Sequence, residues 1–147
     1  MPKYHGGCYC GAIRYEISLD SPGEARTSLC HCGNCKKFTG GPFGLTTKLP
    51  RSSLTLTSGS TTLHTADNGS GSLLHREFCS TCGGPICEYG DAVKDSTRYV
   101  FTGTLDDWKG AVEGDGWARP KGEFFTEKRA EWEKPVDGCF QKRRIKE

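Results

Sequence analysis

Apolar and polar residues alternate in four segments of the chain, which is the pattern of a β-strand with one buried face. The clearest segment spans residues 13–19, where isoleucine, tyrosine and leucine alternate with charged and polar residues. The same alternation covers residues 43–49, 54–56 and 98–105. We therefore predict strands in these four segments.

Glycine and proline leave little room for helices between these strands. The chain has 20 Gly and 7 Pro, and turn-forming residues separate the alternating segments. We expect only short helices, one after Cys35 and one within residues 105–112. Residues 121–134 are charged with interspersed aromatics, and we predict an ordered edge or loop there because large aromatics seldom all stay exposed. The predicted fold class is mainly β, with two small antiparallel sheets.

Composition suggests that apolar burial is not the only force holding the fold together. Hydrophobic residues make up 34% of the 147 residues, and this length predicts a single domain over residues 1–147. No apolar run approaches the length of a signal or membrane segment, so we expect a cytoplasmic protein without a membrane partner. In a reducing compartment, the nine cysteines favour metal binding over disulfides.

The charge pattern gives little indication of a macromolecular partner. The net charge is +2, and basic residues gather only in a C-terminal tail, residues 140–147. Such a short tail is usually solvated, which argues against nucleic-acid binding. A small-molecule substrate is the expected partner, and the sequence does not predict the oligomeric state.

Two cysteine pairs lie far apart in the sequence, and each is flanked by glycine. They are Cys8-x-Cys10 and Cys79-x-x-Cys82. A pair on one tight turn presents two thiolates to one point, and two such pairs make a closed tetrahedral zinc site with a structural role. We predict this site, which would tie the N-terminal strand to a distant loop. The alternative is that the pairs are merely buried thiols.

Three further cysteines, Cys30, Cys32 and Cys35, form a dense cluster. Three thiolates around one zinc leave the fourth position for water or a substrate atom, which is the arrangement of a catalytic zinc. A thiol held there as thiolate is a nucleophile towards a small carbonyl carbon. We therefore predict these cysteines as the ligands of a catalytic zinc.

Alternatives remain open for this cluster. The three cysteines can complete a second closed site with Cys87 or His31, or act as redox thiols without metal. His31 would point away from its neighbours in an extended segment, so we expect it behind the ligands or at the surface. Cys87 and Cys139 have no partner at ligand spacing, and we interpret both as free thiols.

The residues around the cysteines form three longer motifs. They read Gly-Gly-Cys8-x-Cys10-Gly-Ala-Ile-Arg-Tyr, Cys30-His-Cys32-x-x-Cys35-Lys-Lys-Phe-Thr-Gly-Gly-Pro-Phe and Phe-Cys79-x-x-Cys82-Gly-Gly-Pro. Over about residues 5–132, seven cysteines in this order and with these flanks resemble the family of glutathione-dependent formaldehyde-activating enzymes. That family shares its domain with centromere protein V.

The resemblance implies both a fold and an activity. The fold is Mss4-like, with small β-sheets organised around zinc. A structural zinc would lie on Cys8, Cys10, Cys79 and Cys82, and a catalytic, more labile zinc on Cys30, Cys32 and Cys35. The activity is that of a carbon–sulfur lyase, whose named reaction joins glutathione and formaldehyde into S-(hydroxymethyl)glutathione. The implied substrate is a glutathione or other thiol–aldehyde adduct.

The chain departs from the family pattern near its end. Many members have Pro-x-x-His-Ile, whereas residues 120–124 read Pro-Lys-Gly-Glu-Phe, so Glu123 stands at the usual histidine position. Residues 67–73 are rich in Gly and Ser, a loop expected to reshape the substrate mouth. Because one fold serves many functions, the alternative is a non-catalytic zinc-binding module for a protein partner.

Overall fold

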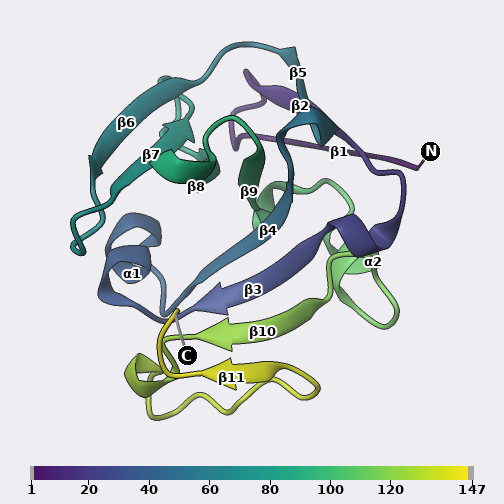
Figure 1. Cartoon of the computed structure of the whole chain (residues 1–147). Coiled ribbons are helices and arrows are strands. Elements are labelled where there is room, and N and C mark those ends of the chain that lie inside the picture. The colour runs from purple at the N-terminus through teal and green to yellow at the C-terminus, as the bar shows by residue number, and fades with distance from the viewer. Residues whose placement is uncertain (1, 146–147) are drawn as a thin grey trace.

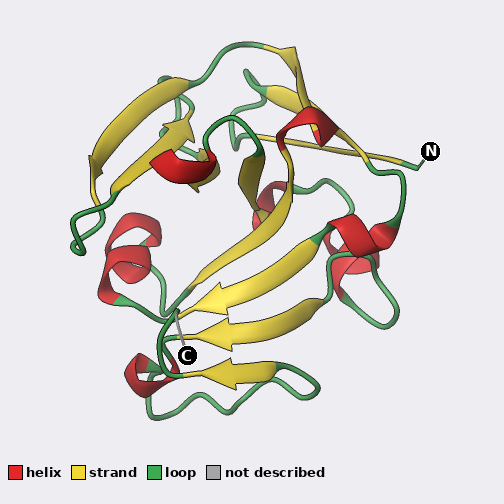
Figure 2. Ribbon diagram, viewed as in Figure 1, coloured by secondary structure: helices red, strands yellow, loops and turns green. Residues whose placement is uncertain are grey.

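Strands are the main regular secondary structure of the described chain, residues 2–145 of a computed structural model (Figure 2). A three-stranded antiparallel sheet has the order β1-β2-β5, and a mixed sheet of eight strands has the order β11-β10-β3-β4-β9-β8-β7-β6. The bounds are β1 (Lys3–Gly7), β2 (Arg14–Ser18), β3 (Arg26–Cys30), β4 (Gly44–Pro50), β5 (Leu54–Ser58), β6 (Thr62–Asp67), β7 (Leu73–Phe78), β8 (Pro85–Gly90), β9 (Thr97–Phe101), β10 (Pro120–Phe124) and β11 (Phe140–Lys142).

The helices of the described residues are short. They are α1 (Gly33–Thr39) and α2 (Trp108–Val112), with 3₁₀ turns at Pro22–Glu24, Arg51–Ser53, Asp91–Val93, Thr102–Thr104 and Thr126–Lys128. α2 lies within the predicted residues 105–112, whereas α1 begins at Gly33, two residues before Cys35, after which the helix was predicted. No helix among residues 2–145 has the length and apolarity needed to cross a membrane.

The prediction of a mainly β fold is confirmed, and the alternating segments become β2, β4, β5 and β9. The sequence predicted two small antiparallel sheets. The larger sheet of the structure instead has eight strands, and its strand β10 runs parallel to both β3 and β11. The prediction of an edge or loop from residue 121 is wrong for β10, because this strand lies inside the sheet. Its sequence contains Gly122 and Glu123, and neither residue type favours a strand.

The core lies between the two sheets. Tyr15 and Ile17 of β2 are both 0% exposed, and they belong to one buried cluster with Leu49 of β4 and Val100 of β9. The hydroxyl of Tyr15 lies 2.6 Å from Oγ1 of Thr104, so its buried polar end has a partner. The period-2 pattern of β2 thus places one full face of the small sheet against the large one.

The path of β3 positions the cluster of three cysteines. β3 ends at Cys30, the chain turns through His31 and Cys32, and α1 begins at Gly33. Figure 1 shows α1 beside the point where β3 ends and β4 begins. The C-terminal part of the chain returns to this region as β11, next to β10. Of the predicted basic tail, residues 146 and 147 lie outside the described residues.

Candidate functional site

The structure brings the two distant cysteine pairs together. The Sγ atoms of Cys8, Cys10, Cys79 and Cys82 lie within 4.8 Å of one another. The Cys10 sulfur is 3.6 Å from that of Cys8 and 3.7 Å from that of Cys79. Sulfurs that share a tetrahedral zinc lie about 3.8 Å apart, because the Zn–S bond is about 2.3 Å. The four thiols therefore form a donor set that fits a closed zinc site.

Backbone N–H groups support the ionised form of these sulfurs. The N–H of Ile13 donates to Sγ of Cys8 at 3.2 Å, and the N–H of Gly84 donates to Sγ of Cys82 at 3.4 Å. Burial alone would raise the pKa of Cys8, but the hydrogen bonds from Ile13, Cys10 and Cys79 outweigh burial and lower this pKa to about 6. Such donors around the ligands tune a metal site.

The backbone turn after Cys79 requires glycine. Gly83 has a φ of +74°, in the left-handed region that glycine adopts without steric cost. Its N–H donates to the carbonyl oxygen of Cys79 at 2.8 Å, which closes the turn that carries Cys82. The glycines that flank the pair in the sequence thus have a direct role in its geometry.

Cys30, Cys32 and Cys35 form a second group, with their Sγ atoms also within 4.8 Å of one another. Cys30 closes β3, Cys32 caps the start of α1, and Cys35 lies in the first turn of α1. The Sγ atoms of Cys30 and Cys32 are 3.3 Å apart, and the N–H of Cys35 donates to Sγ of Cys32 at 3.3 Å. Three thiols on a strand end and a helix start thus face one point.

Cys32 is the sulfur of this group that ionises most readily. Hydrogen bonds from the thiols of Cys30 and Cys35, together with the N–H of Cys35, lower the pKa of Cys32. The hydrogen bond between the thiols of Cys30 and Cys32 raises the pKa of Cys30. Metal ions bind cysteine as the thiolate, so a sulfur that is already ionised favours binding of a metal by this group.

Among the described residues, neither Cys87 nor His31 joins this group of three. Cys87 lies in the core at 1% exposure, and burial raises the pKa of its thiol. Cys139 lies apart from both groups, and its Sγ donates to the carbonyl oxygen of Pro120 at 3.2 Å. The structure therefore does not form the closed four-ligand arrangement that the sequence left open.

His31 is buried at 1% exposure and is not part of the cysteine group, so of the two expected positions, behind the ligands or at the surface, the structure has the first. Its Nε2 lies 2.8 Å from Oε1 of Glu123, and its backbone N–H donates to the carbonyl oxygen of Phe124. Its Nδ1 faces Oε2 of Glu133 at 3.8 Å. The contacts with Glu123 and Phe124 attach the cysteine loop to β10.

Glu123 is itself buried at 1% exposure and has several partners. Its Oε2 accepts hydrogen bonds from the N–H of Val136 at 2.8 Å and from Nε2 of Gln141 at 2.7 Å, and Nη2 of Arg129 lies 3.4 Å away. Burial would raise the pKa of Glu123, but these bonds and the one to His31 lower it. Sequence reasoning noted Glu123 only as a departure from the family pattern, and its role in this network was missed.

A second polar network, centred on Arg76 of β7, contacts α1. Nη1 of Arg76 donates to Oδ1 of Asn34 at 3.1 Å, and Nε of Arg76 lies 3.3 Å from Oε2 of Glu88. The guanidinium of Arg76 also stacks over the ring of Phe38 at 4.2 Å. Nδ2 of Asn34 donates to the carbonyl oxygen of Asn68 at 3.0 Å, so the loop between β6 and β7 is attached to α1.

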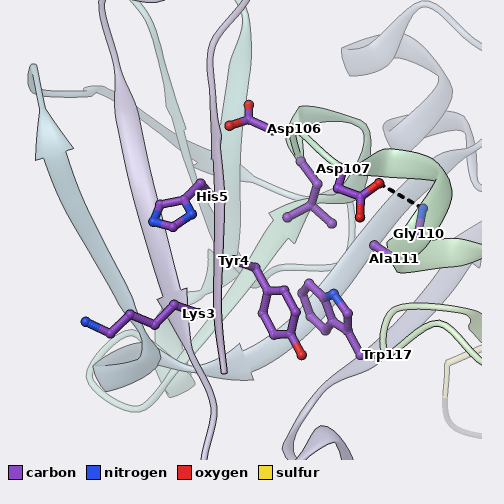
Figure 3. Close-up of a pocket in the computed structure, with 9 residues that line it drawn as sticks. Lys3, Tyr4, His5, Asp106, Asp107, Gly110, Ala111 and Trp117 are labelled. Atoms are coloured by element: carbon purple, nitrogen blue, oxygen red, sulfur yellow. Dashed lines mark hydrogen bonds between the residues drawn. The ribbon is translucent and has the colours of Figure 1, made fainter. Parts of the chain in front are cut away.

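The structure also contains a cavity of about 290 Å³ that no cysteine lines. Figure 3 shows Tyr4 and Trp117 side by side at this cavity, with Lys3 and His5 on one side and Asp107 on the other. The two aromatic rings stack with centroids 4.3 Å apart. Oδ1 of Asp107 accepts a hydrogen bond from the N–H of Gly110 at 3.1 Å. Lys3 and His5 pair with Glu16, which does not line the cavity, and among the described residues the cavity holds no candidate metal group.

Comparison with known proteins gives a consistent result. The sequence model of a family described as glutathione-dependent formaldehyde-activating enzyme matches residues 3–128. A protein of Schizosaccharomyces pombe that is named as an uncharacterised lyase is 31% identical over 83 residues. The match covers 56% of this chain and 55% of that protein, so the chain spans about half the length of this curated relative.

A solved structure is similar in fold. The crystal structure of a Rhodobacter sphaeroides protein matches with a TM-score of 0.53 and 23% sequence identity. The match covers 70% of this chain and 88% of that chain. At this identity the likeness concerns the fold alone.

Proposed function

The chain belongs to the family of glutathione-dependent formaldehyde-activating enzymes, and we propose that it is a zinc-dependent carbon–sulfur lyase acting on a glutathione or other thiol–aldehyde adduct. The observation that carries this proposal is the group of Cys30, Cys32 and Cys35, which gathers three thiols without a fourth ligand residue among residues 2–145. A ligand set of three protein residues is typical of a catalytic zinc, whereas four are typical of a structural one.

The chemistry of the donors supports zinc at both groups. Thiolate sulfur is a preferred ligand of zinc, and both groups place their sulfurs at distances that one ion can bridge. We assign the structural zinc to Cys8, Cys10, Cys79 and Cys82. At the three-cysteine group, a bound zinc would supply a Lewis acid with one position open to a substrate thiol.

The reaction proposed for the site is addition and its reverse. The thiol sulfur forms a bond to the aldehyde carbon while the thiol proton passes to the carbonyl oxygen, giving a hemithioacetal, which for formaldehyde is the S-hydroxymethyl adduct. In the reverse direction the carbon–sulfur bond breaks and the proton returns to sulfur. The residues around the cysteines position them. The contact between His31 and Glu123 holds the loop that carries Cys30 and Cys32, and the hydrogen bond from Arg76 to Asn34 holds α1.

Exchange spectroscopy tests the proposal directly. We expect the zinc-loaded protein to speed the NMR exchange between free glutathione, formaldehyde and their adduct relative to the solution without protein. Cys32→Ser should lose this acceleration, since it removes one of three ligands. Cys139→Ser is the matched control, because this thiol belongs to neither cysteine group. If no thiol–aldehyde pair exchanges faster with the wild-type protein, the lyase proposal fails.

A further inference from the structure

Strand β6 forms an open edge of the large sheet. It stands last in the sheet order and, among the described residues, pairs only with β7, through six consecutive residue pairs without a register shift. All six residues of β6 are exposed. Figure 1 shows β6 on the outside of the fold, with no further strand along its outer side. One edge of this strand is therefore available to a strand of another chain.

The hydrogen bonds of the β6–β7 hairpin show which backbone groups face the open edge. In an antiparallel pair, hydrogen-bonded residue pairs alternate with non-hydrogen-bonded ones. The N–H of Asn68 donates to the carbonyl oxygen of Ser72 at 2.9 Å, and these two residues continue the register of the hairpin as an opposite pair. The alternation then leaves Leu63, Thr65 and Asp67 in the non-hydrogen-bonded pairs. Their N–H and C=O groups point away from β7 and have no backbone partner among residues 2–145.

The other sheet edges are protected against pairing, whereas β6 is not. β11 has only three residues and includes Lys142. In the small sheet, β5 pairs with β2 through a register shift, and the outer edge of β1 is bound by Leu105 and Asp106. Short edges, lysine, bulges and covering segments all discourage pairing with another chain. β6 contains neither lysine nor proline, has no register shift, and is exposed along its whole length.

The open edge of β6 is complementary to itself. A twofold axis perpendicular to the sheet makes two β6 strands antiparallel and keeps each face of the sheet on the same side. When this axis passes between the two copies of Thr65, Leu63 of each copy stands opposite Asp67 of the other copy. These three residues have the outward backbone groups, so each opposite pair among them forms two hydrogen bonds. This register pairs β6 over its full length.

The charges of β6 favour a second copy of the chain over a different protein. His64 and Asp67 are the only titratable residues of the strand. In the symmetric register, Asp67 lies opposite Leu63 and His64 lies opposite Ala66 of the other copy, so no like charges meet. A register centred on His64 would instead place two histidines opposite each other. A strand with so little charge has no pattern that would select an acidic or a basic segment of another protein.

We propose that two copies of the chain pair through β6 in this register, so that their large sheets become continuous. The inference goes beyond the proposed function and does not rest on it, since β6 contains no cysteine. Pairing also places Leu63, 55% exposed in the single chain, beside side chains of the second copy. A strand of six residues is about 20 Å long, which is a short contact for a permanent dimer. The dimer is therefore reversible, with an expected dissociation constant of about 1–100 μM.

Sedimentation equilibrium of the zinc-loaded protein tests the inference without any variant. Over loading concentrations from about 1 μM to about 500 μM, the average mass should rise from that of one chain, 16.1 kDa, towards twice that value. The mass of a single chain at every concentration overturns the inference. A mass that rises beyond two chains also overturns it, because a twofold contact is closed and adds no third copy.

A proline variant tests the backbone contact at the axis. The N–H of Thr65 points away from β7, so Thr65→Pro removes hydrogen bonds between the copies and leaves the β6–β7 hydrogen bonds in place. We expect the dimer to weaken about tenfold or more, since two hydrogen bonds are lost at the axis. Thr65→Val is the matched control, because it keeps the N–H and favours a strand, and it should dimerise like wild type. A folded Thr65→Pro variant with an unchanged dissociation constant overturns the inference.

Two lysine variants test the register and do not depend on proline. Thr65→Lys places a lysine opposite its own copy, whereas Leu63→Lys places a lysine opposite Asp67 of the other copy. Like charges at the axis should make the Thr65→Lys dimer about threefold or more weaker than the Leu63→Lys dimer at low salt. The difference should largely disappear at about 1 M salt, which screens exposed charges. Equal dissociation constants at low salt, or a weaker Leu63→Lys dimer, would overturn the assigned pairing.

Discussion

Nε2 of His31 lies 2.8 Å from Oε1 of Glu123, a residue 92 positions further along the chain. His31 stands between two cysteines of the candidate catalytic group, and Glu123 belongs to an interior strand of the large sheet. Both side chains are 1% exposed. The contact therefore joins the cysteine loop to an interior strand of the large sheet.

Removing the carboxylate of Glu123 should damage both stability and metal retention. We expect Glu123→Ala to lower the free energy of unfolding by about 3–5 kcal/mol, because it removes a buried carboxylate that faces His31 and Arg129 and accepts the N–H of Val136. The three-cysteine group should then release zinc faster in a chelator competition, while Glu123→Gln should have a smaller effect. Glu127→Ala is the control, since Glu127 is exposed and pairs only weakly with Arg144 at 3.8 Å. Unchanged zinc release in Glu123→Ala would show that the contact has no positioning role.

The two cysteine groups should differ in how firmly they hold zinc. We expect two zinc ions per chain, and a chelator should remove the one at the three-cysteine group first because its fourth position is open to exchange. Cys32→Ser should reduce the count to one and leave the fold intact. Cys82→Ser should instead destabilise the whole chain, since metal binding and folding are coupled there. Loss of both ions at the same rate would argue against the distinction.

The cysteine spacing carried most of the information that the sequence holds about the site. Each cysteine pair lies on one turn, and the three-cysteine group lies on a strand end and a helix start, so short spacings and flanking glycines indicated these local arrangements. The meeting of the two distant pairs is a product of the fold, and zinc binding at either group stays a prediction. The alternation of β2 was equally informative, because one face of that strand is fully buried.

What could not be predicted depends on contacts between distant segments. Residues 120–124 show no strand pattern, and β10 exists because it pairs with β3 on one side and β11 on the other. Gly122 packs directly under the ring of Phe140 of β11, where a Cβ would clash. The partners of Glu123 are likewise visible only once the chain has folded, since Val136 and Gln141 lie beyond the end of β10.

Gly44 should be required at the three-cysteine group for steric reasons. A Cβ at this position would lie 3.1 Å from Cβ and 3.4 Å from Sγ of Cys35, which is closer than most real contacts. We expect Gly44→Ala to displace the Cys35 sulfur, to speed zinc loss from this group and to lower exchange activity. Gly33→Ala is the matched control, because its added methyl would meet nothing within 4 Å. Equal zinc retention in the two variants would show that the loop accommodates the methyl group.

The ion pair between Arg14 and Asp106 gives a prediction about pH. The hydrogen bond from Arg14 lowers the pKa of Asp106 below its usual value of 3.8, despite partial burial. Such a carboxylate stabilises the fold at every pH above its unfolded pKa, and the contribution is lost only as the pH falls through the folded pKa.

The expected size of this contribution is small and constant over the working range. The two side chains are 39% and 49% exposed, so solvent screens the pair and Asp106→Asn should cost less than about 1 kcal/mol. Urea unfolding of wild type and variant in zinc-containing buffer should give the same difference at about pH 8 and about pH 5, since both values lie above the unfolded pKa. A difference that shrinks already between these two pH values would mean that the Asp106 carboxyl titrates above its usual range, contrary to the lowered pKa.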